Sequence, residues 1–157
     1  MLFPSCICCA TNCSSFCDPA ISTSTVFQAV IGGIADATCT PCTAFNNTYV
    51  LPYDTIAPFC LYRYSFAPNQ IFPAGDPTCD PPNLQARQIY FQVILRGGTN
   101  YISQLVLDYR AVFLVTWEYD HGTSKPDCSA FSSLSLTLIS QSGVCDASAA
   151  TASISAV

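Results

Sequence analysis

The sequence is short of charged side chains, and of basic ones above all. Only 10% of its 157 residues are charged, against a usual share of about 25%. Five Lys and Arg stand against ten Asp and Glu, so the formal net charge is -5. Binding to nucleic acid or to anionic lipid headgroups depends on clustered Lys and Arg side chains. We therefore expect no nucleic-acid partner and no polybasic membrane patch.

Long hydrophobic runs are also absent. The longest apolar stretches lie around residues 26–34 and 111–115, well below the roughly 18–20 residues that a membrane-spanning helix needs. This predicts no membrane insertion. The first seven residues contain no basic side chain and no sustained apolar stretch, so they do not resemble a secretory signal. Export by another route, or loss of a signal, stays open.

Residues suited to catalysis are scarce. His121 is the only histidine and Glu118 the only glutamate, and both lie in the run Glu118-Tyr119-Asp120-His121. A Ser–His–Asp hydrolase could use His121, with Asp108 or Asp127 to orient it. The sequence has no G-x-S-x-G motif that would supply the nucleophile. We expect His121 to be a solvated turn residue, and the protein to be no enzyme and to use no cofactor.

Cysteine, by contrast, is abundant, with eleven residues. This favours an oxidising, extracellular or cell-surface setting. An N-terminal arm, residues 1–20, precedes a globular domain, residues 21–157, and the cysteines divide between them. The arm holds Cys6, Cys8, Cys9, Cys13 and Cys17, and the domain holds Cys39, Cys42, Cys60, Cys79, Cys128 and Cys145. We expect structural disulfides in the domain. Because eleven is odd, at least one thiol stays free or pairs outside the chain, and we expect the arm to crosslink neighbouring subunits.

Spacing restricts the disulfide pairing only in part. Cys128 and Cys145 flank a predicted strand of roughly 30 Å, too long for a bond between its ends. The proline-rich loop that carries Cys79 could fold over to meet Cys39 or Cys42. The alternative is zinc, since Cys39-x2-Cys42 is half of a zinc knuckle, but Cys60, Cys79, Cys128 and Cys145 supply no second C-x2-C in the domain. The loop Gly75–Asp80 offers oxygens for calcium but lacks EF-hand spacing. We therefore expect no metal.

The rest of the sequence is typical of β-strands. The clearest is 132–140, where Leu alternates with Ser and Thr, and the clearest hairpin is 87–110, which turns at 97–100. Further strands are predicted at 25–38, with an interruption at Gly32-Gly33, and at 48–53, 59–66, 111–120 and 151–157. A loop is predicted at 67–82, where five prolines fall. No helical period of useful length appears. We predict an all-β fold, a two-sheet antiparallel sandwich of jelly-roll or immunoglobulin-like type with a Cys-rich N-terminal arm.

One segment carries a resemblance. Cys39-Thr40-Pro41-Cys42 is followed by Phe45, Asn46-Asn47-Thr48-Tyr49, an apolar strand and then Cys60-Leu61-Tyr62. This resembles a pattern of uncharacterised, Cys-rich exported bacterial β-domain proteins, in which C-x2-C precedes Asn-Gly-Thr-Tyr. Asn47 replaces the commoner Gly and tolerates the positive φ of a tight turn. The resemblance covers about residues 25–157. It implies an exported β-domain and brings no activity.

These features together predict self-association. Monomeric β-proteins protect their strand edges with Lys and other charges, and this chain has one Lys. We predict a secreted structural subunit that assembles into an extracellular filament, sheath or surface layer from copies of itself. Disulfides and strand addition by residues 21–31 or 151–157 would hold the assembly.

The alternative is a carbohydrate-binding or adhesion module with glycans as partners. It would use exposed aromatic rings as stacking platforms, and five are candidates: Trp117, Tyr62, Tyr64, Tyr101 and Tyr119. The competing expectation is that these rings pack in the core or pair across strands.

Overall fold

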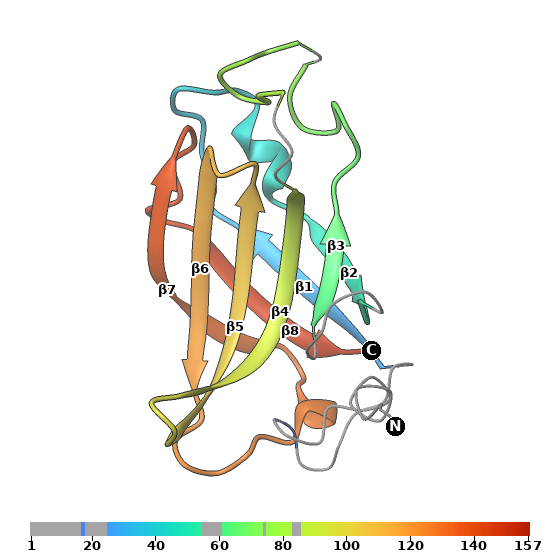
Figure 1. Cartoon of the computed structure of the whole chain (residues 1–157), viewed down its shortest axis with the longest axis vertical. Helices are drawn as coiled ribbons and strands as arrows, with labels where there is room; N and C mark the ends of the chain where they lie inside the picture. The colour runs from blue at the N-terminus through green and yellow to red at the C-terminus, as the bar shows by residue number, and fades with distance from the viewer. Residues whose placement is uncertain (1–16, 18–24, 55–60, 74, 83–85) are drawn as a thin grey trace, which may run out of the picture.

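A computed structural model describes residues 17, 25–54, 61–73, 75–82 and 86–157 (Figure 1). Within this part the chain is all-β. Its strands are β1 (Val26–Gly32), β2 (Thr48–Pro52), β3 (Tyr62–Ser65), β4 (Arg87–Arg96), β5 (Asn100–Tyr109), β6 (Phe113–Asp120), β7 (Leu134–Gly143) and β8 (Thr151–Ala156). Two short 3-10 helices, η1 (Cys42–Phe45) and η2 (Cys128–Ala130), lie in the connections. No helix in these residues is long and apolar enough to cross a membrane.

The strands form one antiparallel sheet in the order β2-β1-β8-β7-β6-β5-β4-β3. The two outer strands, β2 and β3, meet through a bridge between Tyr53 and Tyr62, where the Asp54 N–H donates to the Leu61 carbonyl at 2.8 Å. The sheet is therefore nearly closed into a barrel. The predicted all-β class is confirmed, whereas a sandwich of two separate sheets is not what forms.

Strand β7 is the reason that one sheet forms. Its beginning, Leu134–Leu136, pairs with β8, and its remainder pairs with β6. Thr116 of β6 pairs with Ser140 of β7, but the next residue, Trp117, pairs with Leu138. Ile139 is therefore an extra residue of β7, and β7 bulges there. A bulge bends a strand and increases its twist. β7 therefore runs continuously from the back layer of Figure 1 into the front layer.

The predicted strands follow from alternating hydrophobicity. In β6 the side chains of Phe113, Val115 and Trp117 are fully buried, while Leu114 faces outward. The hairpin of β4 and β5 has the predicted turn, and the loop at 67–82 forms neither helix nor strand where it is described. The interruption predicted at Gly32-Gly33 is confirmed, since β1 ends at Gly32 and Gly33 has φ +78°. The predicted continuation to residue 38 does not form a strand, and only an isolated bridge between Ala35 and Asp146 follows.

Aromatic rings fill the interior in two groups. In the first group Phe45, the last residue of η1, packs edge to face against Phe66, Phe72 and Tyr109. In the second group Phe27 of β1 contacts Tyr62, Phe91 and Phe131. Trp117 is buried as well, and its Nε1–H donates to the Ala150 carbonyl at 3.4 Å. These large buried side chains supply most of the hydrophobic stabilisation of the fold.

Disulfides fasten the barrel at both ends. Cys42, in η1, is bonded to Cys145, and Cys39, just before η1, is bonded to Cys79. Cys128, in η2, is bonded to Cys17. Figure 1 shows η1 at the upper end and η2 at the lower end. The prediction that Cys128 and Cys145 are not bonded to each other is confirmed. The loop of Cys79 folds over to meet Cys39, one of the two partners that the spacing left open.

One expectation about cysteine changes. Cys17, grouped with the arm that would crosslink subunits, is bonded within the chain to Cys128. Both cysteines of the half zinc knuckle are used in disulfides with other partners, so neither thiolate is available to a metal. Cys60 and the remaining arm cysteines, Cys6, Cys8, Cys9 and Cys13, lie outside the described residues.

Candidate functional site

His121 follows β6 at the lower end of the barrel. Its ring stacks on Phe131 with a centroid distance of 5.7 Å, and its Nε2 lies 2.7 Å from the Ser103 hydroxyl. Ser103 points into the barrel from β5 and is completely buried. Burial lowers the pKa of His121, and only the neighbouring carboxylate of Asp120 opposes this. His121 is thus a neutral side chain that covers one end of the core, whereas the sequence predicted a solvated turn residue.

The Ser103–His121 pair lacks the remaining parts of a hydrolase. Asp108 accepts from the Ala111 N–H at 3.0 Å and Asp127 from the Ser129 N–H at 3.2 Å, so both candidate orienting acids hold their own turns. Because Ser103 has no exposed surface, its hydroxyl cannot reach a substrate in this conformation. A nucleophile must be accessible and its base oriented by a third group. The pair acts as a buried polar contact.

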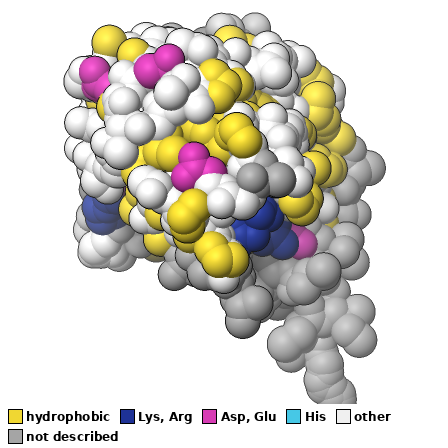
Figure 2. Space-filling view, turned by 90° about the horizontal axis from the view of Figure 1, so that it is seen from above, with side chains coloured by type: hydrophobic (Ala, Val, Ile, Leu, Met, Phe, Trp, Pro, Cys, Tyr) yellow, Lys and Arg dark blue, Asp and Glu magenta, His cyan; other side chains and the backbone are white. Residues whose placement is uncertain are grey.

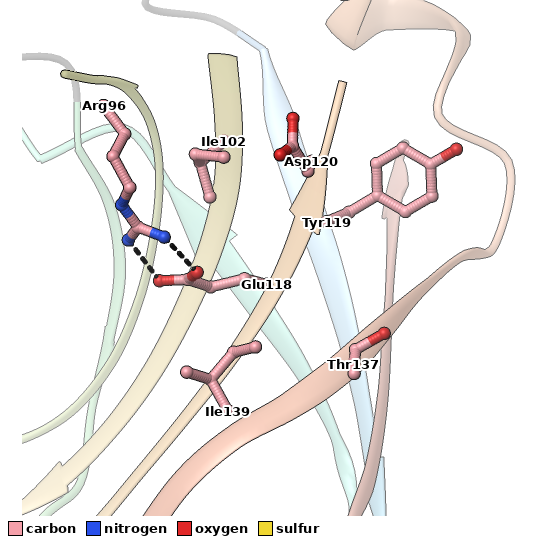
Figure 3. Close-up of a pocket in the computed structure, with 7 residues that line it drawn as sticks. All are labelled: Arg96, Ile102, Glu118, Tyr119, Asp120, Thr137 and Ile139. Atoms are coloured by element: carbon pink, nitrogen blue, oxygen red, sulfur yellow. Dashed lines mark hydrogen bonds and ion pairs between the residues drawn. The ribbon is translucent and has the colours of Figure 1, made fainter. Parts of the chain in front are cut away.

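A second polar group lies on the outer face of β4, β5 and β6 (Figure 3). Glu118 and Arg96 form a two-pronged ion pair with both contacts at 2.7 Å. The amide of Gln104 also donates to Glu118 at 2.9 Å. The Arg96 guanidinium holds the pKa of Glu118 below its ordinary value, against the opposing effect of burial. An open hollow of about 540 Å³ lies here, lined on its sides by Ile102 and Ile139.

The hollow bears on the carbohydrate hypothesis. Tyr119 lines it and is 42% exposed, as a stacking platform requires. Figure 3 shows, however, that its ring points away from the Arg96–Glu118 pair, as expected for adjacent residues of a strand. Of the other candidate platforms, Trp117 and Tyr62 are buried in the core, and Tyr64 and Tyr101 are half-buried.

The third polar group fixes the proline-rich loop. Asp80 is buried, accepts a hydrogen bond from the Arg87 Nε–H at 3.0 Å and forms an ion pair with the Arg110 guanidinium at 3.0 Å. Asp76 in the same loop accepts from the Thr78 and Cys79 N–H groups. The carboxylates that sequence reasoning considered for calcium are therefore already occupied. Among the described residues no group of three His, Cys, Asp or Glu is placed to hold a metal ion.

The charged side chains share one property. All four arginines of the chain pair with an acid: Arg63 with Asp54, Arg87 and Arg110 with Asp80, and Arg96 with Glu118. The other acids in the described part each accept from a backbone N–H of a nearby turn. These are Asp36, Asp76, Asp108, Asp120, Asp127 and Asp146. Charge in this chain is used to hold its own structure together.

Figure 2 shows the upper end of the molecule, where a few charged side chains lie among many hydrophobic and uncharged ones. The residues that sequence reasoning missed are the partners, Arg96 for Glu118 and Ser103 for His121. Only the strand register could have found them, because each partner is at least 18 residues away.

Comparison with protein-family models, with curated proteins and with solved structures found no match for this chain.

Proposed function

We propose that this protein is a secreted structural subunit that assembles with copies of itself outside the cell and performs no catalysis. The observation that carries the proposal is the use of charge described above. Each of its four arginines is paired with an acid of the same chain, and only 10% of its residues are charged. The protein therefore has few of the unpaired surface charges that normally prevent association.

The disulfides support an extracellular role. Three of them join distant parts of the described chain, which is typical of proteins in oxidising compartments. A covalently fastened barrel also suits a building unit, because it keeps its shape under load or dilution. The resemblance to exported Cys-rich β-domains agrees with this proposal.

The proposal does not include the strand addition by residues 21–31 or 151–157 that the sequence suggested. β1 is hydrogen-bonded to β2 on one side and β8 on the other, and β8 lies between β1 and β7. Neither strand has a free edge to offer a neighbour. We assign the lasting link instead to the cysteine left over by the odd count of eleven.

Size and thiol state test the proposal. The full chain, made in an oxidising host, is examined by sedimentation velocity, electron microscopy and non-reducing gel electrophoresis. We expect particles much larger than one chain, with disulfide-linked bands that disappear on reduction. A dispersed monomer at high concentration would contradict self-assembly, and a polymer without linked bands would contradict the crosslink alone.

A carbohydrate-binding role is the second candidate, and the exposure of Tyr119 beside Asp120 favours it. A glycan array probed with the full chain and with Tyr119→Ala tests it. Binding that the substitution removes would support a lectin-like module. An array without hits would remove this candidate.

A further inference from the structure

Four neighbouring strands of the sheet contain no charged residue. β2, β1, β8 and β7 are adjacent, and none contains Asp, Glu, Lys, Arg or His. The other four strands carry Arg63, Arg87, Arg96, Asp108, Glu118 and Asp120. Nothing in the fold requires this division, since the outer face of an antiparallel sheet ordinarily carries charges.

The outward side chains of these strands stand in register. One row across the sheet runs through Thr48, Val30, Ser153 and Ser135. The next row runs through Val50, Gln28 and Ser155. We call these seven residues the uncharged face. Val30 is 46% exposed and Val50 52%, and both lie on the paired strands β1 and β2, one row apart.

The chemistry of this face suits contact with a second copy of the chain. Two copies each carry a net charge of -5 and repel one another, and this face is where they can approach without burying a charge. Val, Ser and Thr also lose little side-chain entropy on burial, whereas Lys and Glu lose most. Covering a face of valines and hydroxyl groups therefore costs little side-chain entropy.

We propose that the uncharged face binds the same face of a second copy, with Val30 and Val50 at the centre of a two-fold contact. This inference rests on the proposed self-assembly and names its surface. A two-fold contact uses the same patch on both partners, so it closes after two copies. A longer assembly then needs a second kind of contact, which the leftover cysteine supplies.

The size of the face sets the strength expected of the contact. Four strands about 4.8 Å apart and five or six residues long cover roughly 350 Å² of flat area. Two such faces bury less than the roughly 1,200–2,000 Å² of a stable complex. The contact between two uncharged faces is therefore weak by itself. A disulfide that holds copies together raises their effective concentration, so that the contact persists.

The test places charge on the face and compares it with charge elsewhere. Val30→Lys/Val50→Lys is the test variant. Leu114→Lys, at an exposed position of β6 on the charged half, is the matched control. Both are studied as full chains by sedimentation velocity over a range of concentrations, with circular dichroism to confirm the fold. A third variant, Val30→Thr/Val50→Thr, removes apolar surface without adding charge.

We expect the double lysine variant to lose the large species and to keep only small disulfide-linked ones, with the association constant reduced at least tenfold. Leu114→Lys should behave as the unsubstituted chain, and the threonine variant should fall between them. If the double lysine variant does not fold, the threonine variant decides. Weaker association in that variant supports the uncharged face as the contact, and unchanged association overturns it.

The outcomes separate this inference from the proposed function. A large assembly that survives all three substitutions overturns the face and leaves self-assembly standing. Equal disruption by Leu114→Lys also overturns it, since any added charge would then act alike. If the unsubstituted chain is a monomer throughout, both proposals fail.

Discussion

The ion pairs of Asp80 and of Glu118 differ in how far their arginine partners are buried. The Asp80 carboxylate and both of its arginines are largely shielded from water. In the outer pair, Glu118 is covered but the Arg96 side chain is 52% exposed. Water can replace a lost partner in the second case and not in the first.

Substitutions at the two acids should therefore differ in cost. We expect Asp80→Asn to lower the free energy of unfolding by about 3–5 kcal/mol, because two guanidinium groups stay buried without a counter-charge. Glu118→Gln should cost only about 1 kcal/mol. Urea unfolding at pH 7 measures both. Equal losses would show that burial does not decide the strength of these pairs.

His121 should make stability depend on pH. Its pKa in the folded protein lies below the ordinary 6.5 because burial disfavours the charged ring. The unfolded chain then binds a proton first as the pH falls. Stability is full above pH 6.5 and decreases as the pH falls from there through the folded-state pKa.

The variant His121→Gln should lack this decrease in the same window, while Ser103→Ala, which keeps the ring, should retain it. Thermal unfolding measured between pH 7 and the start of carboxylate titration tests the expectation. An unchanged slope in His121→Gln would assign the pH dependence to other groups.

At the scale of elements, the end of β7 that pairs with the start of β6 depends on Gly143, the last residue of β7. Gly143 has φ +117°, and a Cβ there would lie 2.0 Å from the Val112 carbonyl oxygen. Gly97, in the turn between β4 and β5, also has positive φ, at +62°, but a Cβ there meets nothing within 4 Å.

Gly143→Ala should thus be far more damaging than Gly97→Ala. The second substitution carries only the penalty of a left-handed residue, about 1–2 kcal/mol. The first adds a backbone clash that the strand can relieve only by shifting, so we expect a loss of more than about 3 kcal/mol. Chemical denaturation of the two variants gives the comparison, and similar losses would mean that β7 accommodates the side chain.

Sequence patterns identified most strands because each pattern is local. The leucines at 134, 136 and 138 alternate with Ser and Thr, and the hairpin of β4 and β5 turns at its two glycines. The closure of the sheet is not local. It depends on β7 pairing with both β6 and β8 and on the Tyr53–Tyr62 bridge. The alternation of polar and apolar residues within a strand does not indicate either contact.

For the whole molecule, the disulfides that span the most chain should contribute most. Cys42–Cys145 closes 103 residues and Cys39–Cys79 closes 40. The entropy of loop closure predicts roughly 4.7 and 3.9 kcal/mol. We expect Cys42→Ser/Cys145→Ser to be the less stable double variant by about 1 kcal/mol in urea unfolding. The reverse order would show that the loop held by Cys79 contributes contacts beyond its crosslink.

Association should strengthen with salt. Copies with a net charge of -5 repel, and raising NaCl from about 0.01 M to about 1 M shortens the range of that repulsion from about 30 Å to about 3 Å. A contact built from uncharged side chains loses nothing in return. Sedimentation at the two salt concentrations tests this, and weaker association at high salt would point to an ionic interface.

The candidate site was less accessible to sequence reasoning than the fold. That β1, β2, β7 and β8 lack charge was readable in the sequence, but only the strand order places them side by side. Likewise, the single glutamate was visible at once, whereas its partner Arg96 comes from the strand two positions away in the sheet. Local patterns locate residues, and the register decides which ones meet.

The pairing of β1 with β8 has a consequence for biosynthesis. Phe27 lies opposite Ala156, so β1 can pair with β8 only after almost the whole sequence has been synthesised. Cys17 and Cys42 likewise wait for partners 111 and 103 residues later. A nascent chain of this kind cannot complete its sheet or form these two disulfides until most of it has been synthesised.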